Sequence, residues 1–176
     1  PICYWMCDIG RFNYHWIEGE NRLRKPLARD AKGGLQPTTW AEVTGKVKDR
    51  LAQAGSANPD GVRFLLSAHG SIEELFLFGR LSEELLGPNG PSALTVAWKV
   101  SEKVQPARTK FKVPTVDAPN VNGARALGLV PGAVGSPQGE ADLGALKAAV
   151  AAGTVTALYV FDPGPDGSLG DTQWIL

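Results

Sequence analysis

The sequence predicts an α/β fold, a mostly parallel sheet with helices on both faces, preceded by a small irregular or β-rich lead-in. Two observations predict it. Short apolar runs of strand length alternate with segments of helical periodicity from residue 39 onward, and two of these helical segments begin with a capping-box pattern. We therefore divide the chain into a lead-in, residues 1–38, and an α/β domain, residues 39–176.

The lead-in combines aromatic and charged residues without a sustained period, which predicts short strands and turns. At its end, the sequence from Thr39 to Glu42 fits a capping box, in which a hydroxyl and a carboxylate bond the first free amides of a helix. Apolar residues then follow at helical spacing. We expect a helix to about Gln53.

The first core strand is expected at Val62–Ser67, which is an apolar run of strand length. Ser71 to Glu74 forms a second capping box and predicts a helix through about Leu86, stopped by Gly87 and Pro88. The next strand is expected at Ala93–Trp98. A strand, a helix and a further strand in this order favour a right-handed crossover between parallel strands.

Residues 102–139 are rich in proline and glycine, and only a short helix near Gly123–Leu127 is expected there. A segment this long inside a compact domain is typical of a functional loop, an interface or disorder. Asp142–Ala152 then predicts a helix ended by Gly153, and Val155–Phe161 predicts a strand.

The charges balance, with 18 Lys and Arg against 18 Asp and Glu and a pI near 7.2. Such a chain has no net field to attract nucleic acid or an anionic membrane. No apolar run is long enough to span a bilayer, so we expect a soluble, cytoplasmic protein. Pro1 in place of Met, and the apolar end at Trp174–Leu176, indicate a piece of a longer protein.

Nucleotide binding is the first function that a parallel sheet suggests, at the turn after the first core strand. The turn Ser67–Ser71 lacks the G-x-G-x-x-G spacing, and Glu73 and Glu74 would oppose an anion, so a capped helix is the better prediction. The turn from Asp162 to Gly167, with carboxylates at Asp162 and Asp166, lacks the spacing of a calcium loop and predicts a Pro–Gly turn instead.

Catalytic residues are not expected in this chain. His15 and His69 are its only histidines and are far apart in sequence, which disfavours a histidine metal site. The sequence has no G-x-S-x-G elbow. Cys3 and Cys7 are either ordinary thiols or part of an iron–sulfur ligand set, which needs four thiolates, and their spacing alone favours thiols.

The run Tyr4–His15, with its Cys-Asp-x-Gly-Arg-Phe-x-Tyr pattern, resembles a segment of the large iron–sulfur subunit of bacterial NADH:quinone oxidoreductase, complex I. The stretches Asn21–Leu27 and Thr39–Val43 resemble the continuation of that subunit into its molybdopterin-oxidoreductase-like domain. The order of features agrees along the whole chain, and the specific motifs lie in the first forty or so residues.

This resemblance implies that Cys7 is the fourth ligand of an extra 4Fe-4S cluster in the full-length protein, where three upstream cysteines supply the other ligands. It implies no cofactor in this chain alone, and it leaves Cys3 a plain thiol. The related molybdenum and tungsten enzymes have a lysine where this chain has Ile9, which favours the complex I branch.

The resemblance thus implies a chain that serves mainly as scaffold in electron transfer from NADH through iron–sulfur clusters to quinone. Its expected partners are the other peripheral-arm subunits, at the cytoplasmic side of the inner membrane, with no nucleic acid and no membrane insertion. Residues 102–139 would be a packing surface. The alternatives are a fragment of a molybdopterin-dependent oxidoreductase such as a formate dehydrogenase, and a non-catalytic binding module.

Overall fold

The chain forms two compact units, Pro1–Asp49 and Arg50–Leu176. The lead-in boundary expected at residue 38 stays a prediction. The structure is a computed structural model, and it describes residues 12, 14–20, 22–108, 110, 112–135, 141–164, 168–169 and 171–175.

The first unit contains a 3₁₀ turn, η1 (His15–Glu18), and a hairpin of β1 (Leu27–Arg29) and β2 (Leu35–Pro37). The two strands are antiparallel. Between them, the Asp30 carboxylate accepts hydrogen bonds from the amides of Gly34 at 2.8 Å and Lys32 at 2.9 Å. These amides hold the pKa of Asp30 below its usual value. For this part of the lead-in, the expected short strands and turns are confirmed.

Helix α2 (Trp40–Ala57) extends four residues beyond its expected end. The predicted capping box is present: the Glu42 amide donates to Thr39 Oγ1 at 3.3 Å, and the Thr39 amide donates to Glu42 Oε2 at 3.4 Å. The Thr38 hydroxyl also donates to Glu42. Together these bonds lower the pKa of Glu42, with the Thr38 hydroxyl as the largest cause.

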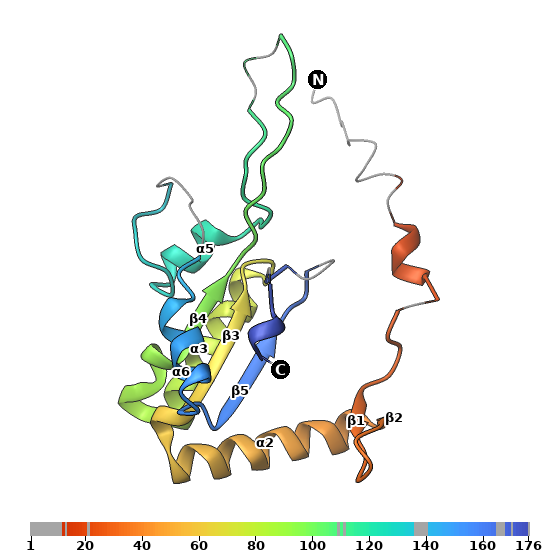
Figure 1. Ribbon diagram of the computed structural model, residues 1–176, viewed down its shortest axis with the longest axis vertical. Helices are drawn as coiled ribbons and strands as arrows, with labels where there is room; N and C mark the ends of the chain where they lie inside the picture. The colour runs from red at the N-terminus through yellow and green to blue at the C-terminus, as the bar shows by residue number, and fades with distance from the viewer. Residues whose placement is uncertain are drawn as a thin grey trace. The chain divides into compact units, whose positions relative to one another are not determined.

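The second unit is built on a parallel three-stranded sheet in the order β4–β3–β5 (Figure 1). The central strand, β3 (Val62–Ser67), pairs on one side with β4 (Leu94–Ala97) and on the other with β5 (Ala157–Phe161). All three strands were expected, and β3 has its predicted bounds. The predicted α/β class with a parallel sheet is confirmed.

Helices cover both faces of this sheet. Successive side chains of a strand point to opposite faces, so neighbouring residues of β3 contact different helices. Phe64 and Leu66 pack in a core cluster with α3 (Ile72–Leu86) and α5 (Val121–Ala126). Leu65 packs in a second cluster with α6 (Gly144–Ala151). The expectation of helices on both faces is therefore confirmed.

One helical segment was not predicted. After α3 ends at Leu86, the chain continues through a 3₁₀ turn, η3 (Gly87–Asn89), into the short helix α4 (Gly90–Ala93). Gly87, at φ 58°, ends α3 as expected, and a proline near the start of each following element is compatible with a new helical turn. A further 3₁₀ turn, η2 (Pro59–Gly61), precedes β3, and η4 (Gln173–Ile175) follows β5.

The first part of the Pro-rich segment forms two antiparallel arms, which run side by side in Figure 1. Val100 and Val116 form an antiparallel bridge, and the Ser101 amide donates to the Thr115 carbonyl at 2.9 Å. The Gln105 side chain bonds the backbone of Val113 at 2.9 and 3.1 Å. The arms precede α5.

Among the described residues, no helix is long and apolar enough to cross a membrane.

Candidate functional site

The carboxyl ends of the parallel strands are the place where a ligand site is expected in this class of fold. β3 ends at Ser67 and β5 at Phe161, in adjacent register, because Leu66 pairs with Phe161. The segments that follow these two strands therefore lie at one edge of the sheet. From β3 the chain crosses over to β4, which is the neighbour of β3 on one side, whereas β5 is its neighbour on the other side.

Three polar side chains meet at this edge. Ser67 Oγ lies 2.5 Å from Ser168 Oγ, and the Ser168 hydroxyl also contacts Asp162 Oδ1. Ser67 is fully buried and Ser168 is 4% exposed, whereas Asp162 is exposed. Since Asp162 is the member open to solvent, the two buried hydroxyls form a hydrogen-bonded path from the sheet interior to a surface carboxylate. We call these three residues the serine–aspartate network.

His69 follows β3 and forms hydrogen bonds through both its backbone amide and its side chain. Its amide donates to Ser67 Oγ at 3.1 Å, and its ring Nε2 lies 2.5 Å from the Asp117 carbonyl oxygen. Because a carbonyl can only accept, Nε2 carries the proton. A side chain at Gly164 would place its Cβ 2.3 Å from Ser168 Oγ and 2.9 Å from His69 Cγ, so this close approach requires glycine.

The turn between β3 and α3 uses its own backbone donors. The amides of residues 68–71 bond, in order, the Ala97 carbonyl, the Ser67 hydroxyl, the Ser67 carbonyl and the Glu74 carboxylate. The predicted Ser71–Glu74 capping box is confirmed. Since each of these amides already donates within the fold, the turn is a poor phosphate site, in agreement with the sequence-based interpretation.

Asp117 connects the arms to this edge of the sheet. Its carboxylate accepts from Lys103, in an ion pair, and from the Ser101 hydroxyl at 2.5 Å. The hydrogen bond from Lys103 and then that from Ser101 lower the pKa of Asp117. Asn120 adds two bonds to the loop after β3, from its amide to the Ala68 carbonyl and from Nδ2 to the Gly70 carbonyl. The loop after β3 is thus hydrogen-bonded to Asp117, through the His69 ring, and to Asn120.

The candidate residues that the sequence singled out are divided between the two units and the residues that the structure does not describe. Cys3 and Cys7 lie outside the described residues, as does Asp166. His15 belongs to the first unit, where its ring stacks near Tyr14 with centroids 4.4 Å apart, while His69 belongs to the second. Within the described part of the chain, no group of three or more His, Cys, Asp and Glu side chains could hold a metal ion.

The serine–aspartate network does not have the arrangement of a catalytic nucleophile. A nucleophilic serine must be open to its substrate as well as bonded to a base. Ser168 is bonded to the Asp162 carboxylate, but it is only 4% exposed and Ser67 is fully buried. The Nε2 of His69 is bonded to a backbone carbonyl and not to either serine. The network can hold the loop after β5 against the end of β3. Sequence reasoning missed Ser67 and Ser168, because their contact spans 101 residues and serine is common in turns.

Part of the chain is similar to large bacterial oxidoreductases. It is 28% identical over 85 residues to the G subunit of the NADH-quinone oxidoreductase of Streptomyces coelicolor, a match covering 48% of this chain and 10% of that protein. It is also 29% identical over 84 residues to provisionally named formate dehydrogenases of Staphylococcus aureus strains MRSA252 and USA300, covering 47% of this chain and 8% of each.

The chain therefore spans about a tenth or less of the length of these curated relatives. The similarity supports a relationship to oxidoreductases, and it is almost equal for the two kinds of relative. No protein-family model matches the chain, and no solved structure matches it.

Proposed function

We propose that this chain is part of an iron–sulfur subunit that passes electrons from NADH toward quinone, and that its described residues serve as scaffold. The observation that carries the proposal is the similarity to the NADH-quinone oxidoreductase protein over 85 residues. The carboxyl edge of the sheet supports a scaffold role, because the polar side chains that meet there bond one another or the backbone. The electron carriers would then belong to other parts of the full-length protein.

Cys7 is the residue of this chain that we assign to the electron path, as the fourth ligand of a 4Fe-4S cluster in the full-length protein. Iron–sulfur clusters of this kind are held by four cysteine thiolates, so the remaining three would come from outside this chain. The test is to replace Cys7 with Ser in the full-length protein, with Cys3→Ser as the matched control, and to measure iron, acid-labile sulfide and electron paramagnetic resonance spectra.

We expect Cys7→Ser to lose about four iron atoms per protein, the content of one 4Fe-4S cluster, together with its signal. Cys3→Ser should keep both. Equal iron content in the two variants would remove Cys7 from the ligand set. The oxidoreductase relationship would stand in that case, since it depends on the sequence similarity and not on the cysteine.

The assembly context is part of the same proposal. The other peripheral-arm subunits would be the partners, at the cytoplasmic side of the inner membrane, and residues 102–139 would provide a packing surface. Val104, on one arm, is 95% exposed, so a substitution there changes the surface of the arm and not its packing. In co-purification of the complex, Val104→Asp should release the neighbouring subunit, and an unchanged yield would remove this surface from the proposal.

A pterin-dependent oxidoreductase is the second candidate, favoured by the 29% identity to the formate dehydrogenases. Metal and pterin analysis of the full-length protein separates the two. Molybdenum or tungsten bound with a pterin would favour a pterin-dependent oxidoreductase. Iron and sulfide without a pterin would support the NADH-linked iron–sulfur subunit. A non-catalytic binding module predicts none of these groups.

A further inference from the structure

Helix α3 exposes apolar side chains beside the end of α5. Ile72, Phe76 and Leu77 are each between 43% and 62% exposed and line one hollow together with Leu127, whereas Leu75 on the inner side is fully buried. Single exposed apolar residues are common, but a group that lines one hollow is typical of an interaction site. We call these three exposed residues the α3 outer patch.

Two open hollows adjoin this patch and give it the form of a groove. One, of about 430 Å³, is lined by Ile72, Phe76 and Leu77 together with Leu127. The other, of about 390 Å³, shares Phe76 and Leu127 and continues past Gly79 toward Pro91. The residues of α3 that line the two hollows run from Ile72 to Glu83, which is about 18 Å of helix at 1.5 Å per residue. A groove of this length can accept about three turns of a second helix.

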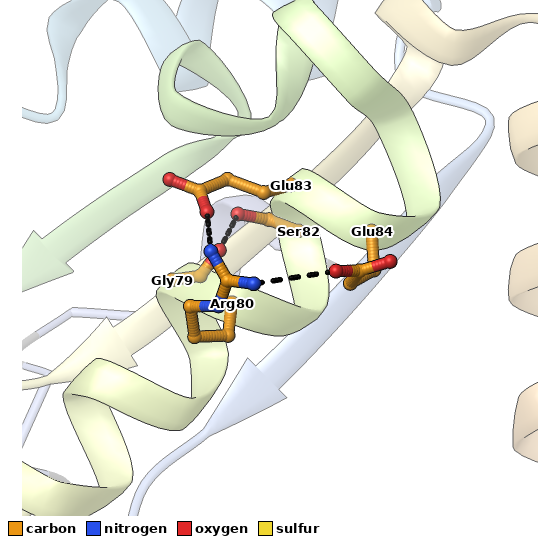
Figure 2. A network of polar contacts seen from close by, with 5 residues as sticks. All are labelled: Gly79, Arg80, Ser82, Glu83 and Glu84. Atoms are coloured by element: carbon orange, nitrogen blue, oxygen red, sulfur yellow. Dashed lines mark hydrogen bonds and ion pairs between the residues drawn. The ribbon is translucent and has the colours of Figure 1, made fainter.

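The rim of the groove is acidic. Glu73 lines the first hollow and Glu83 lines the second. Arg80 lies between Glu83, at 2.9 Å, and Glu84, at 3.3 Å, as Figure 2 shows, so its single charge is shared by two carboxylates. α3 carries four glutamates and one arginine, although the whole chain is neutral. The negative charge is thus concentrated beside the apolar patch.

We propose that the α3 outer patch binds an amphipathic α-helix of a partner protein, with an apolar stripe in the groove and Lys or Arg residues beside Glu73, Glu83 and Glu84. Helices bind grooves in this way through apolar residues three and four positions apart, and complementary charge on the rim sets the partner preference. A second α3 patch would bring like charges together, and an anionic membrane would repel the carboxylates. The inference does not depend on the redox assignment.

The test uses the whole chain and two synthetic helical peptides of 18 residues. Both carry leucine at successive three- and four-residue spacings, and one has lysine at the flanking positions where the other has glutamate. Fluorescence anisotropy gives their Kd values. We expect the lysine peptide to bind at least about tenfold more tightly, and this difference to shrink as salt is raised, because exposed charges are screened.

Two variants locate the binding. Phe76→Ser with Leu77→Ser should raise the Kd of the lysine peptide about tenfold or more, while Leu35→Ser, at an exposed apolar residue of β2, should leave it unchanged. Glu73→Gln with Glu83→Gln should weaken the lysine peptide and leave the glutamate peptide unchanged or slightly tighter. The glutamine pair keeps the apolar surface, so it tests the proposal even if the serine pair unfolds.

Several results would overturn the proposal. Equal binding of the two peptides, or an affinity that neither variant pair changes, would remove the groove as a helix site. A dimer that dissociates in the serine pair, seen by light scattering, would make a second copy the occupant. Sedimentation with phosphatidylglycerol vesicles that the serine pair abolishes would make the surface a membrane contact.

Discussion

Ser168 joins two parts of the chain that are 101 residues apart in sequence, because its hydroxyl contacts both Ser67 and Asp162. A buried hydroxyl without a partner is costly, so a network of this kind is stable only when each member is bonded. Ser67 sits at the end of the central strand, where it is fully buried. The network therefore holds the loop after β5 to the middle of the sheet.

Ser168→Ala should lower the free energy of unfolding by about 1–2 kcal/mol, because it leaves the buried Ser67 hydroxyl without this partner. Urea denaturation measures the loss. Ser92→Ala is the control, since the Ser92 hydroxyl bonds a backbone carbonyl at an exposed site, and it should change stability by less than about 0.5 kcal/mol. Equal losses in the two variants would contradict a special role for the network.

Asp117 is the residue whose charge joins the two arms, because its carboxylate accepts from Ser101 and Lys103, and its pKa is lowered in the folded protein. A carboxyl with a lowered folded pKa stabilises the fold above its unfolded pKa, near 4, and this contribution disappears as pH falls through the lower, folded value. At pH 7, Asp117→Asn should cost up to about 1 kcal/mol, as expected for a partly exposed pair.

The cost of Asp117→Asn should shrink as the pH is lowered below about 4, because the wild-type carboxyl is then protonated first in the unfolded chain and, at lower pH, in the folded protein. Guanidinium denaturation at pH 7, 5 and 3 measures it. Lys103→Met should show the same pH dependence, since Lys103 provides the largest cause of the shift. A cost independent of pH would show that the Lys103 pair is not responsible.

At the scale of elements, the starts of α2 and α3 are encoded locally, by a capping box at each. The packing of other elements against α3 is not encoded by such a local pattern. Gly90, in α4, lies so close to α3 that an added Cβ would be 2.6 Å from the Ser82 carbonyl oxygen, whereas Gly79, in the middle of α3, has open space around it. Two helical glycines thus have opposite roles.

Gly90→Ala should destabilise the protein by about 1–3 kcal/mol, because the backbone of α3 would have to move. Gly79→Ala should instead stabilise it by about 0.5–1 kcal/mol, since alanine is the better helix former and meets no atom within 4 Å. Thermal unfolding followed by circular dichroism compares them. Two changes of the same sign would contradict the packing of α4 on α3.

At the scale of the whole molecule, β3 is the strand on which the second unit depends. It pairs on both sides, and its side chains reach both core clusters. The β1–β2 hairpin of the first unit has three residues in each strand, and β2 is exposed throughout. Opening the hairpin exposes little apolar surface, whereas opening β3 disrupts both clusters.

Amides of β3 should therefore exchange with deuterium at least about 100-fold more slowly than those of the hairpin, since buried core strands open only with the global unfolding of the unit. Native-state hydrogen exchange by NMR, corrected for intrinsic rates, provides the comparison. Similar protection in the two places would indicate that the two units unfold together.

Much of the fold could be predicted from local signals. β3 has its predicted bounds, and α3 starts and ends where its capping box and Gly87 indicate. β4, β5 and α6 are each somewhat shorter than predicted. α4 was missed, because its four residues are too few to show helical periodicity and no side chain caps its start. Cys7 stays a prediction, since it lies outside the described residues.

The sequence by itself determined the α/β class, the order of the main strands and helices, and the capped starts of two helices. The reason is that periodicity, capping residues and glycines act over a few positions. Only the tertiary structure decided that Ser67 meets Ser168, that Asp117 holds Lys103, and that the outer side of α3 stays open beside Leu127. These contacts depend on how the strands pair and the helices pack, and no local pattern specifies that.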